Sequence, residues 1–384
     1  MTNVLRDHAQ LFERPGPWTT IYVEGSTGTV DGLATDEILP RSVAQEMRTA
    51  GAREEDVAAA TTALATTAKG LPDPVARYLL VNDGQAVVDE FLPGDVVGIA
   101  GTTVGPIPDL TPLLRHSPAD FAYLIAEVGH HGGEIYLRHA SGDDAHPTAG
   151  DPGATIEGET DHTRKVGSGG WDQPHRQQHA EQVWKMNSRE VAAEIDRLST
   201  EHHAELIVVA GDIRARQLVA DEVSQSSRDK LGIIESNTRA DGADDAAFSE
   251  AVQEFVARTL ADRQHSLLER LAEKEGQGTR TSAVGRGAVI TALQQAQVES
   301  LLLESTAWDG ETVLALDTAP WIATSPAETA GAEVLGEVPA VAGLLRAAAL
   351  TDAEATLYPS GALADKPIAA LLRWPTGPDM PAAE

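Results

Sequence analysis

The residues with the clearest chemical potential lie in one glycine-rich stretch, Lys165–Arg176. Glycine allows backbone conformations that are closed to other residues, and Trp171 places a large, rigid contact surface in the middle of the stretch. The cations and histidines around it are Arg164, Lys165, Arg176, Lys185, Arg189, His162, His175 and His179. In a chain of formal net charge -30, this local excess of positive charge predicts a loop that reaches a partner.

The overall charge balance limits the classes of partner. The chain has 29 basic and 59 acidic residues, so it lacks the excess of Lys and Arg that general nucleic-acid binding needs. DNA is therefore not an expected partner, and any contact with RNA must come from small basic sites.

Length and composition indicate a multidomain protein. A chain of 384 residues exceeds what one hydrophobic core usually supports, so two or three domains are expected. The absence of cysteine excludes disulfides, thiolate metal sites and cysteine nucleophiles. No signal peptide is recognisable, and no apolar run approaches the roughly 18 residues of a membrane span. A soluble, cytoplasmic protein is therefore expected.

Hydrophobic periodicity predicts the elements that must position the glycine-rich stretch. Two strands precede it, 121–128 and 134–139, and a polar helix over 173–198 follows it. The apolar run 204–210 ends in Gly-Asp before a helix over 214–222, a pattern typical of a buried parallel strand. Further strands are expected at 19–23, 79–81, 86–88, 298–303, 313–316 and 368–374, and helices at 41–69 with a break at Gly51, 243–274, 286–297 and 338–349. The proline-spaced segment 106–114 is predicted to be an extended connector.

The candidate groups also have plainer interpretations. The glycine-rich stretch could be a flexible surface linker, although Trp171 and the flanking cations argue against that. His175 and His179 are four residues apart on an expected helix and could be two metal ligands. Because no third ligand is evident, a solvated or RNA-facing pair is the favoured interpretation, and no metal site is expected.

Four ordered stretches resemble one known family. They are the segment Pro108–Leu114 with the strand pair after it, the glycine-rich stretch with its long helix, the core strand Ala204–Gly211, and the pair Gly287–Leu293 and Ala296–Leu303. In this order they resemble the class-I translation termination factor of eukaryotes and archaea and its relative Pelota. The resemblance is to the bacterial branch that includes the hibernation factor Balon, and it covers roughly residues 106 to 305.

The resemblance implies three domains in a mixed α/β and α+β chain. An α+β N-terminal domain, 1–117, would face the ribosomal decoding centre, although no counterpart of the family's stop-codon-reading motifs is found in it. A ribonuclease-H-like middle domain, 118–275, would carry the glycine loop. The C-terminal α/β domain, 276–384, would resemble ribosomal protein L7Ae.

One departure from the family lies in the glycine loop itself. Termination factors place Gly-Gly-Gln there, and the glutamine helps to position a water against the ester of peptidyl-tRNA. Here Gly169 and Gly170 match, but Trp171 stands in the third position. Tryptophan has one indole donor and no acceptor, so it cannot replace an amide around a water. Gln173 lies two residues on, and a shifted loop could present it, but hydrolysis demands closer placement than a shifted loop provides.

The resemblance also implies partners. The chain is expected to occupy the acceptor site (A site) of the 70S ribosome with elongation factor Tu, as a hibernation or stress factor, not an enzyme. Contacts with 16S and 23S ribosomal RNA are implied, and the glycine-loop residues expected to bind RNA are Arg164, Lys165, Gly167, Gly169, Gly170, Trp171, Gln173, His175 and Arg176. The chain has no Gly-x-x-x-x-Gly-Lys-Ser/Thr loop, so no cofactor is expected and the partner would hydrolyse GTP.

Two other functions stay open at this stage. One is an enzyme, a ribosome-rescue or release factor that hydrolyses peptidyl-tRNA. The other is a stress-linked interaction protein that uses the same scaffold away from the ribosome.

Overall fold

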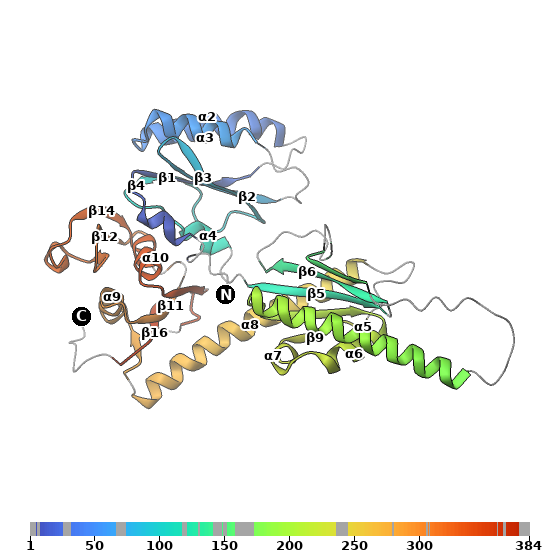
Figure 1. Cartoon of the computed structure of the whole chain (residues 1–384). Coiled ribbons are helices and arrows are strands. Elements are labelled where there is room, and N and C mark those ends of the chain that lie inside the picture. The colour runs from blue at the N-terminus through green and yellow to red at the C-terminus, as the bar shows by residue number, and fades with distance from the viewer. Residues whose placement is uncertain are drawn as a thin grey trace. The chain divides into compact units, whose positions relative to one another are not determined.

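The computed structural model forms two compact units, Met1–Thr2 with Asp120–Gln264 (unit 1) and Asn3–Ala119 with His265–Glu384 (unit 2). The structure describes residues 5, 8–25, 32–66, 74–116, 121–129, 131–140, 148, 152–157, 173–235, 245–278, 280–304, 306, 308–358, 360–363 and 366–375. Helices and strands alternate in both units, as expected for a mixed α/β and α+β protein (Figure 1). The division into three domains stays a prediction.

Unit 1 is built on a five-stranded mixed sheet in the order β7-β6-β5-β8-β9. Its strands are β5 (Ala122–Gly129), β6 (Gly132–His139), β7 (Ala154–Glu157), β8 (Leu206–Gly211) and β9 (Leu231–Ile233). The first three strands pair antiparallel, and β8 and β9 continue the sheet parallel to β5. The two strands expected at 121–128 and 134–139 and the expected buried parallel strand at 204–210 are confirmed. The ribonuclease-H-like assignment stays a prediction.

Helices cover both faces of the unit 1 sheet. They are α5 (Gln173–Glu201), α6 (Ile213–Glu222), α7 (Gln225–Arg228) and α8 (Asp245–Gln277), whose last residues belong to unit 2. The sheet has a hydrophobic core on each face, and successive residues of β8 point into different cores. Ile207 packs with residues of α5 and α6, and Val208 packs with Phe248 of α8. The period of two along a strand therefore places α5 and α8 on opposite faces.

The first part of unit 2 is an antiparallel sheet, β3-β2-β1-β4, with two helices over one face (Figure 1). Its elements are the 3₁₀ helix η1 (Ala9–Glu13), β1 (Trp18–Glu24), α2 (Gly32–Thr49), α3 (Glu54–Leu64), β2 (Val75–Asn82), β3 (Gln85–Pro93) and β4 (Gly101–Gly105). Gly51 has a φ of 85° between α2 and α3, which confirms the expected break. Ile21 and Leu79 pack under these helices, and Tyr22 and Leu80 face the other way.

The second part of unit 2 has two small sheets, β10-β16-β11-β15 and β13-β12-β14. Their strands are β10 (Ser282–Val284), β11 (Val298–Glu304), β12 (Thr312–Leu316), β13 (Ile322–Ala323), β14 (Val334–Pro339), β15 (Glu354–Tyr358) and β16 (Ile368–Leu372), and the helices are α9 (Arg286–Gln294), η2 (Pro326–Glu328) and α10 (Ala340–Leu350). Every residue of α10 from Ala340 to Ala348 is buried. A helix that is apolar on nearly all sides belongs in a core, and α10 is the central element here.

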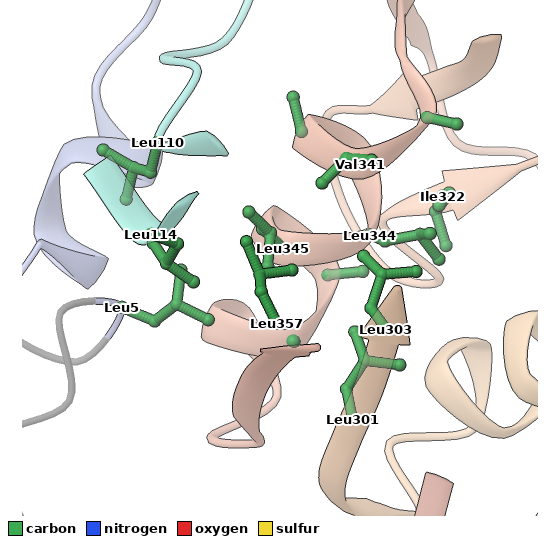
Figure 2. Close-up of a cluster of buried hydrophobic side chains, with 14 of the residues drawn as sticks. Leu5, Leu110, Leu114, Leu301, Leu303, Ile322, Val341, Leu344, Leu345 and Leu357 are labelled. Atoms are coloured by element: carbon green, nitrogen blue, oxygen red, sulfur yellow. The ribbon is translucent and has the colours of Figure 1, made fainter. Parts of the chain in front are cut away.

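One hydrophobic cluster joins the two parts of unit 2. Figure 2 shows Leu110 and Leu114 facing the α10 residues Val341 and Leu345. Leu110 and Leu114 come from the segment 106–114, which was expected to be extended. That expectation is wrong for its last residues, because α4 (Thr111–His116) is helical. Proline is tolerated in the first turn of a helix, as at Pro112, and buried leucines at 110, 113 and 114 match helical spacing.

The sequence prediction also missed several short elements. The strands β4, β7, β9, β10, β13, β14 and β15 were not expected. Among the described residues, no helix combines the length and apolar character that crossing a membrane requires.

Candidate functional site

The glycine-rich stretch connects the end of β7 at Glu157 to the start of α5 at Gln173. Most of the residues expected to bind RNA lie outside the described part of the chain: Arg164, Lys165, Gly167, Gly169, Gly170 and Trp171. Gln173, His175 and Arg176 lie in the first turn of α5, where only the backbone is described. The structure therefore shows how the loop is anchored, and the roles of these residues stay predictions.

The C-terminal half of α5 is held firmly on the sheet. Val191 and Ile195 are at most 1% exposed and belong to the core under β5 and β8. A glycine allows the close approach, because a β-carbon at Gly133 would lie 3.5 Å from Cγ2 of Val191 and only 3.1 Å from the carbonyl oxygen of Glu127. The C-terminal half of α5 is thus fixed on the sheet, and the glycine loop joins the opposite end of the helix.

The N-terminal half of α5 differs from this base. Buried side chains begin at Asn187, and none of the described side chains from 182 to 186 is buried. Figure 1 shows this end of α5 running past the edge of the unit 1 sheet. A helix of 29 residues is about 43 Å long. The end of α5 that joins the glycine loop therefore lies well away from the core.

The cations next on α5 are paired with an acidic residue of α6. Lys185 Nζ lies 3.6 Å from Oε1 of Glu222, and Arg189 Nε donates to Oε2 of the same carboxylate over 3.0 Å. Arg189, with a smaller contribution from Lys185, holds the pKa of the Glu222 carboxyl below its ordinary value. The interpretation of Lys185 and Arg189 as loop cations is therefore incomplete, because one carboxylate offsets part of their charge.

An arginine that the sequence interpretation missed also lies at this helix pair. The guanidinium of Arg214, on α6, lies 5.7 Å from the ring centroid of Trp184, on α5. Such a cation–π contact contributes roughly 0.5–1 kcal/mol at an exposed position. We call Trp184, Lys185, Arg189 and Arg214 the α5–α6 basic cluster. No local pattern identifies Arg214, since it reaches the cluster from 30 residues further along the chain.

The geometry at the start of α6 fixes where Arg214 lies. Gly211 ends β8 with a φ of 112°, and Asp212 caps α6 by accepting hydrogen bonds from the amides of Arg214 and Ala215. Arg214 is therefore in the first turn of a helix whose start is set by the sheet.

The histidines and carboxylates do not form a metal site in the described part of the chain, where no group of three or more potential ligands occurs. His202 and His203 directly follow Glu201, the last residue of α5. The side chains of His175 and His179 lie outside the described residues.

A family model identifies the part of the chain that bears the loop. The model of bacterial archaeo-eukaryotic release factor family 2 matches residues 122–277. Over these residues the chain is similar to that release factor family. The match begins at β5 and ends with α8, so it includes the unit 1 sheet, the glycine loop and the α5–α6 basic cluster.

The chain is also similar to two proteins of similar length. Proteins Rv2629 and MT2704, from two strains of Mycobacterium tuberculosis, are each 22% identical to it over 299 residues, which is 76% of both chains.

Two solved structures are similar to the chain at low sequence identity. Archaeoglobus fulgidus Pelota is 14% identical, covers 78% of this chain and 79% of its own, and has a TM-score of 0.34. Dom34 of S. cerevisiae, a translation termination-like factor, is 11% identical with a TM-score of 0.42, covering 79% and 82%. At such scores, superposition of whole chains carries no argument about function.

Proposed function

We propose that this protein is a ribosome-associated factor that occupies the A site together with elongation factor Tu and does not hydrolyse peptidyl-tRNA. In this proposal it acts under stress or in hibernation, when a filled A site keeps other factors out. The glycine loop extends toward the peptidyl transferase centre and contacts ribosomal RNA.

The observation that carries the proposal is Trp171 in a glycine loop that lies within the match to the release factor family. Hydrolysis of the ester needs a group that both donates to and accepts from the attacking water. The indole has one donor and no acceptor, so Trp171 cannot do this. An indole can, however, stack on an unpaired base, an interaction worth about 1–3 kcal/mol.

The way the loop is anchored supports contact with RNA. The first turn of α5 has no acidic residue, and the positive end of a helix dipole favours a phosphate there. Arg176 lies in that turn, and the α5–α6 basic cluster follows on the exposed half of the helix. Positively charged side chains thus continue from the glycine loop along α5 in a chain that is otherwise acidic.

The partner GTPase is inferred from family resemblance and from what the chain lacks. The sequence has no phosphate-binding loop of the Gly-x-x-x-x-Gly-Lys-Ser/Thr type, so delivery by GTP hydrolysis must depend on another protein. In bacteria elongation factor Tu is the natural candidate.

A second candidate function is hydrolysis of peptidyl-tRNA in ribosome rescue, with Gln173 in place of the loop glutamine. Gln173 is the first residue of α5, next to the loop, which is the observation that keeps this candidate open. Its backbone is helical, however, and a residue in a helix is less free to reach the ester than one at the tip of a loop.

Incubating the purified protein with ribosomes that carry labelled peptidyl-tRNA separates the two functions. The proposal predicts ribosome binding without peptide release, and no effect of Gln173→Ala on release. Peptide release above background that disappears in Gln173→Ala would show that the protein is a hydrolase. That result would contradict the proposed role as an A-site factor without hydrolytic activity.

A further inference from the structure

The strand β14, in the small sheet β13-β12-β14 of unit 2, lies at an open edge. It is the last strand in the order of the sheet, so it has a neighbouring strand on one side only. Among the described residues, β12 alone forms backbone hydrogen bonds with β14. The outer side of β14 therefore has backbone groups that can pair with another extended chain.

Two adjacent apolar side chains of β14 are exposed. In a regular strand, successive side chains point to opposite faces, so one of two neighbours would face the core. The register of β14 against β12 skips Leu335, which makes this residue a β-bulge. Val334 and Leu335 are 41% and 42% exposed. The strand thus presents two neighbouring apolar side chains to a partner.

The rest of β14 is firmly packed on one face. Val338 is 2% exposed and belongs to the hydrophobic cluster that joins the two parts of unit 2. Gly336 lies on the same face, where a β-carbon would be only 3.1 Å from Cγ of Pro106. Because β14 is already ordered, only the partner would lose conformational entropy when it binds.

The chain around this edge is strongly acidic. Residues 305–345 include six acidic residues and no lysine, arginine or histidine. Glu333 and Glu337 flank the exposed pair, are exposed themselves and form no ion pair with a described residue. The Thr312 hydroxyl donates to Oε1 of Glu337, which orients this carboxylate. A cationic partner would therefore meet two carboxylates that no cation of the described chain neutralises.

The charge distinguishes three kinds of occupant. RNA would bring phosphates to an acidic surface, which is unfavourable. A second copy of the chain, paired through β14 about a two-fold axis, would bring Glu333 and Glu337 of both copies together, and like charges repel. A basic segment of another protein meets neither obstacle.

We propose that the β14 edge binds an extended segment of a partner protein that combines apolar residues with lysine or arginine. The segment adds to the sheet as a strand beside β14, and its apolar side chains cover Val334 and Leu335. Its cations pair with Glu333 and Glu337. This interaction goes beyond the proposed ribosomal function and does not depend on it.

Fluorescence anisotropy of a short, end-capped peptide made of valine and lysine, titrated with the full chain, tests the proposal. A peptide with serine in place of valine has the same charge and controls for general attraction to an acidic protein. The valine peptide should bind at least about tenfold more tightly than the serine peptide. Equal affinities would show that charge alone drives binding and would overturn the proposal, as would absence of binding by the valine peptide.

Substitutions on β14 test whether binding occurs at its edge. Val334→Ser together with Leu335→Ser should weaken binding of the valine peptide about tenfold, whereas Ile38→Ser, at an exposed position on α2, should not change it. Glu333→Gln together with Glu337→Gln should weaken binding a few-fold and make it less sensitive to salt. Circular dichroism checks that these exposed-site variants fold. Unchanged affinity in either folded double variant contradicts the proposal.

The two other occupants give different results in the same variants. Self-association of the full chain in sedimentation velocity that disappears in the double serine variant would show that a second copy covers β14. Binding of a single-stranded RNA that is lost in this variant would show that β14 contacts RNA. Either result contradicts the proposal of a basic protein segment.

Discussion

A β-carbon at position 211 would lie 2.1 Å from the carbonyl oxygen of Val128, on the neighbouring strand. Gly211 also has a φ of 112°, which side-chain-bearing residues rarely adopt. The turn from β8 into α6, which positions Arg214 beside Trp184, therefore requires glycine.

Gly211→Ala is expected to destabilise the protein by about 3 kcal/mol, because it adds a steric clash to an unfavourable backbone angle. Urea unfolding followed by circular dichroism measures the change. Gly276→Ala is the matched control, since a β-carbon there meets no atom within 4 Å in helix α8. The control should be neutral or slightly stabilising, and an equal loss in both variants would refute the role of the Val128 contact.

Glu222→Gln should increase binding to ribosomes a few-fold, because it releases Lys185 and Arg189 for contact with phosphate. Binding should also fall more steeply with salt than in the wild type. The loss of two exposed ion pairs should leave the free energy of unfolding nearly unchanged, as urea unfolding can check. Pelleting of ribosomes over a range of salt concentrations measures the affinity and its dependence on salt.

Glu194→Gln is the control for that experiment. Glu194 pairs with Arg197 in the half of α5 that packs on the sheet, away from the loop. Equal gains in both variants would mean that the added affinity reflects net charge alone, and the α5–α6 basic cluster would have no specific part in binding.

Trp171→Ala should weaken ribosome binding about tenfold if the indole stacks on a base. Trp374→Ala removes an exposed tryptophan of unit 2 and should leave the affinity unchanged. Equilibrium binding of fluorescently labelled protein to 70S ribosomes measures both. If Trp171→Ala is folded, as shown by a wild-type helical circular dichroism signal, and its affinity is unaltered, then Trp171 does not contribute to ribosome binding.

The stability of the Asp109→Asn variant relative to the wild type should be greater at neutral pH than in acid. Burial raises the pKa of the Asp109 carboxyl, with the Thr111 hydrogen bonds and the Arg115 charge opposing the rise. The folded state thus favours the protonated form, so the wild-type carboxyl contributes stability in acid that is lost as pH rises through the folded-state pKa. Asparagine keeps an acceptor oxygen for Thr111 but does not ionise.

Comparing urea unfolding of the two proteins below the ordinary aspartate pKa and at neutral pH tests this sign. The difference in stability should move in favour of Asp109→Asn as pH rises. A shift in the opposite direction would mean that the ionised carboxylate stabilises the folded state.

The sequence predicted those elements whose pattern is local. The strand at Leu206–Gly211 and the helix after it have a continuous apolar run, a Gly-Asp junction and helical spacing. Segment 106–114 was misassigned because its prolines outweighed three leucines whose burial depends on α10. Short strands such as β10, three residues long, owe their form to a partner distant in the chain, here β16.

The candidate site was predictable only in part for the same reason. Gly169, Gly170 and Trp171 identify the loop by their order along the chain. A contact between side chains of two helices has no such local sequence pattern. Glu222 lies 33 residues beyond Arg189, and Arg214 lies 30 residues beyond Trp184. Contacts of this kind emerge only when the chain is folded.

A cryo-electron microscopy map of the protein bound to 70S ribosomes with elongation factor Tu tests the central claim most directly. The account predicts density for the chain in the A site, with the glycine loop beside the peptidyl transferase centre, Trp171 against ribosomal RNA, and any peptidyl-tRNA intact. Density at another site, or a loop that presents Gln173 to a cleaved peptidyl-tRNA, would contradict it.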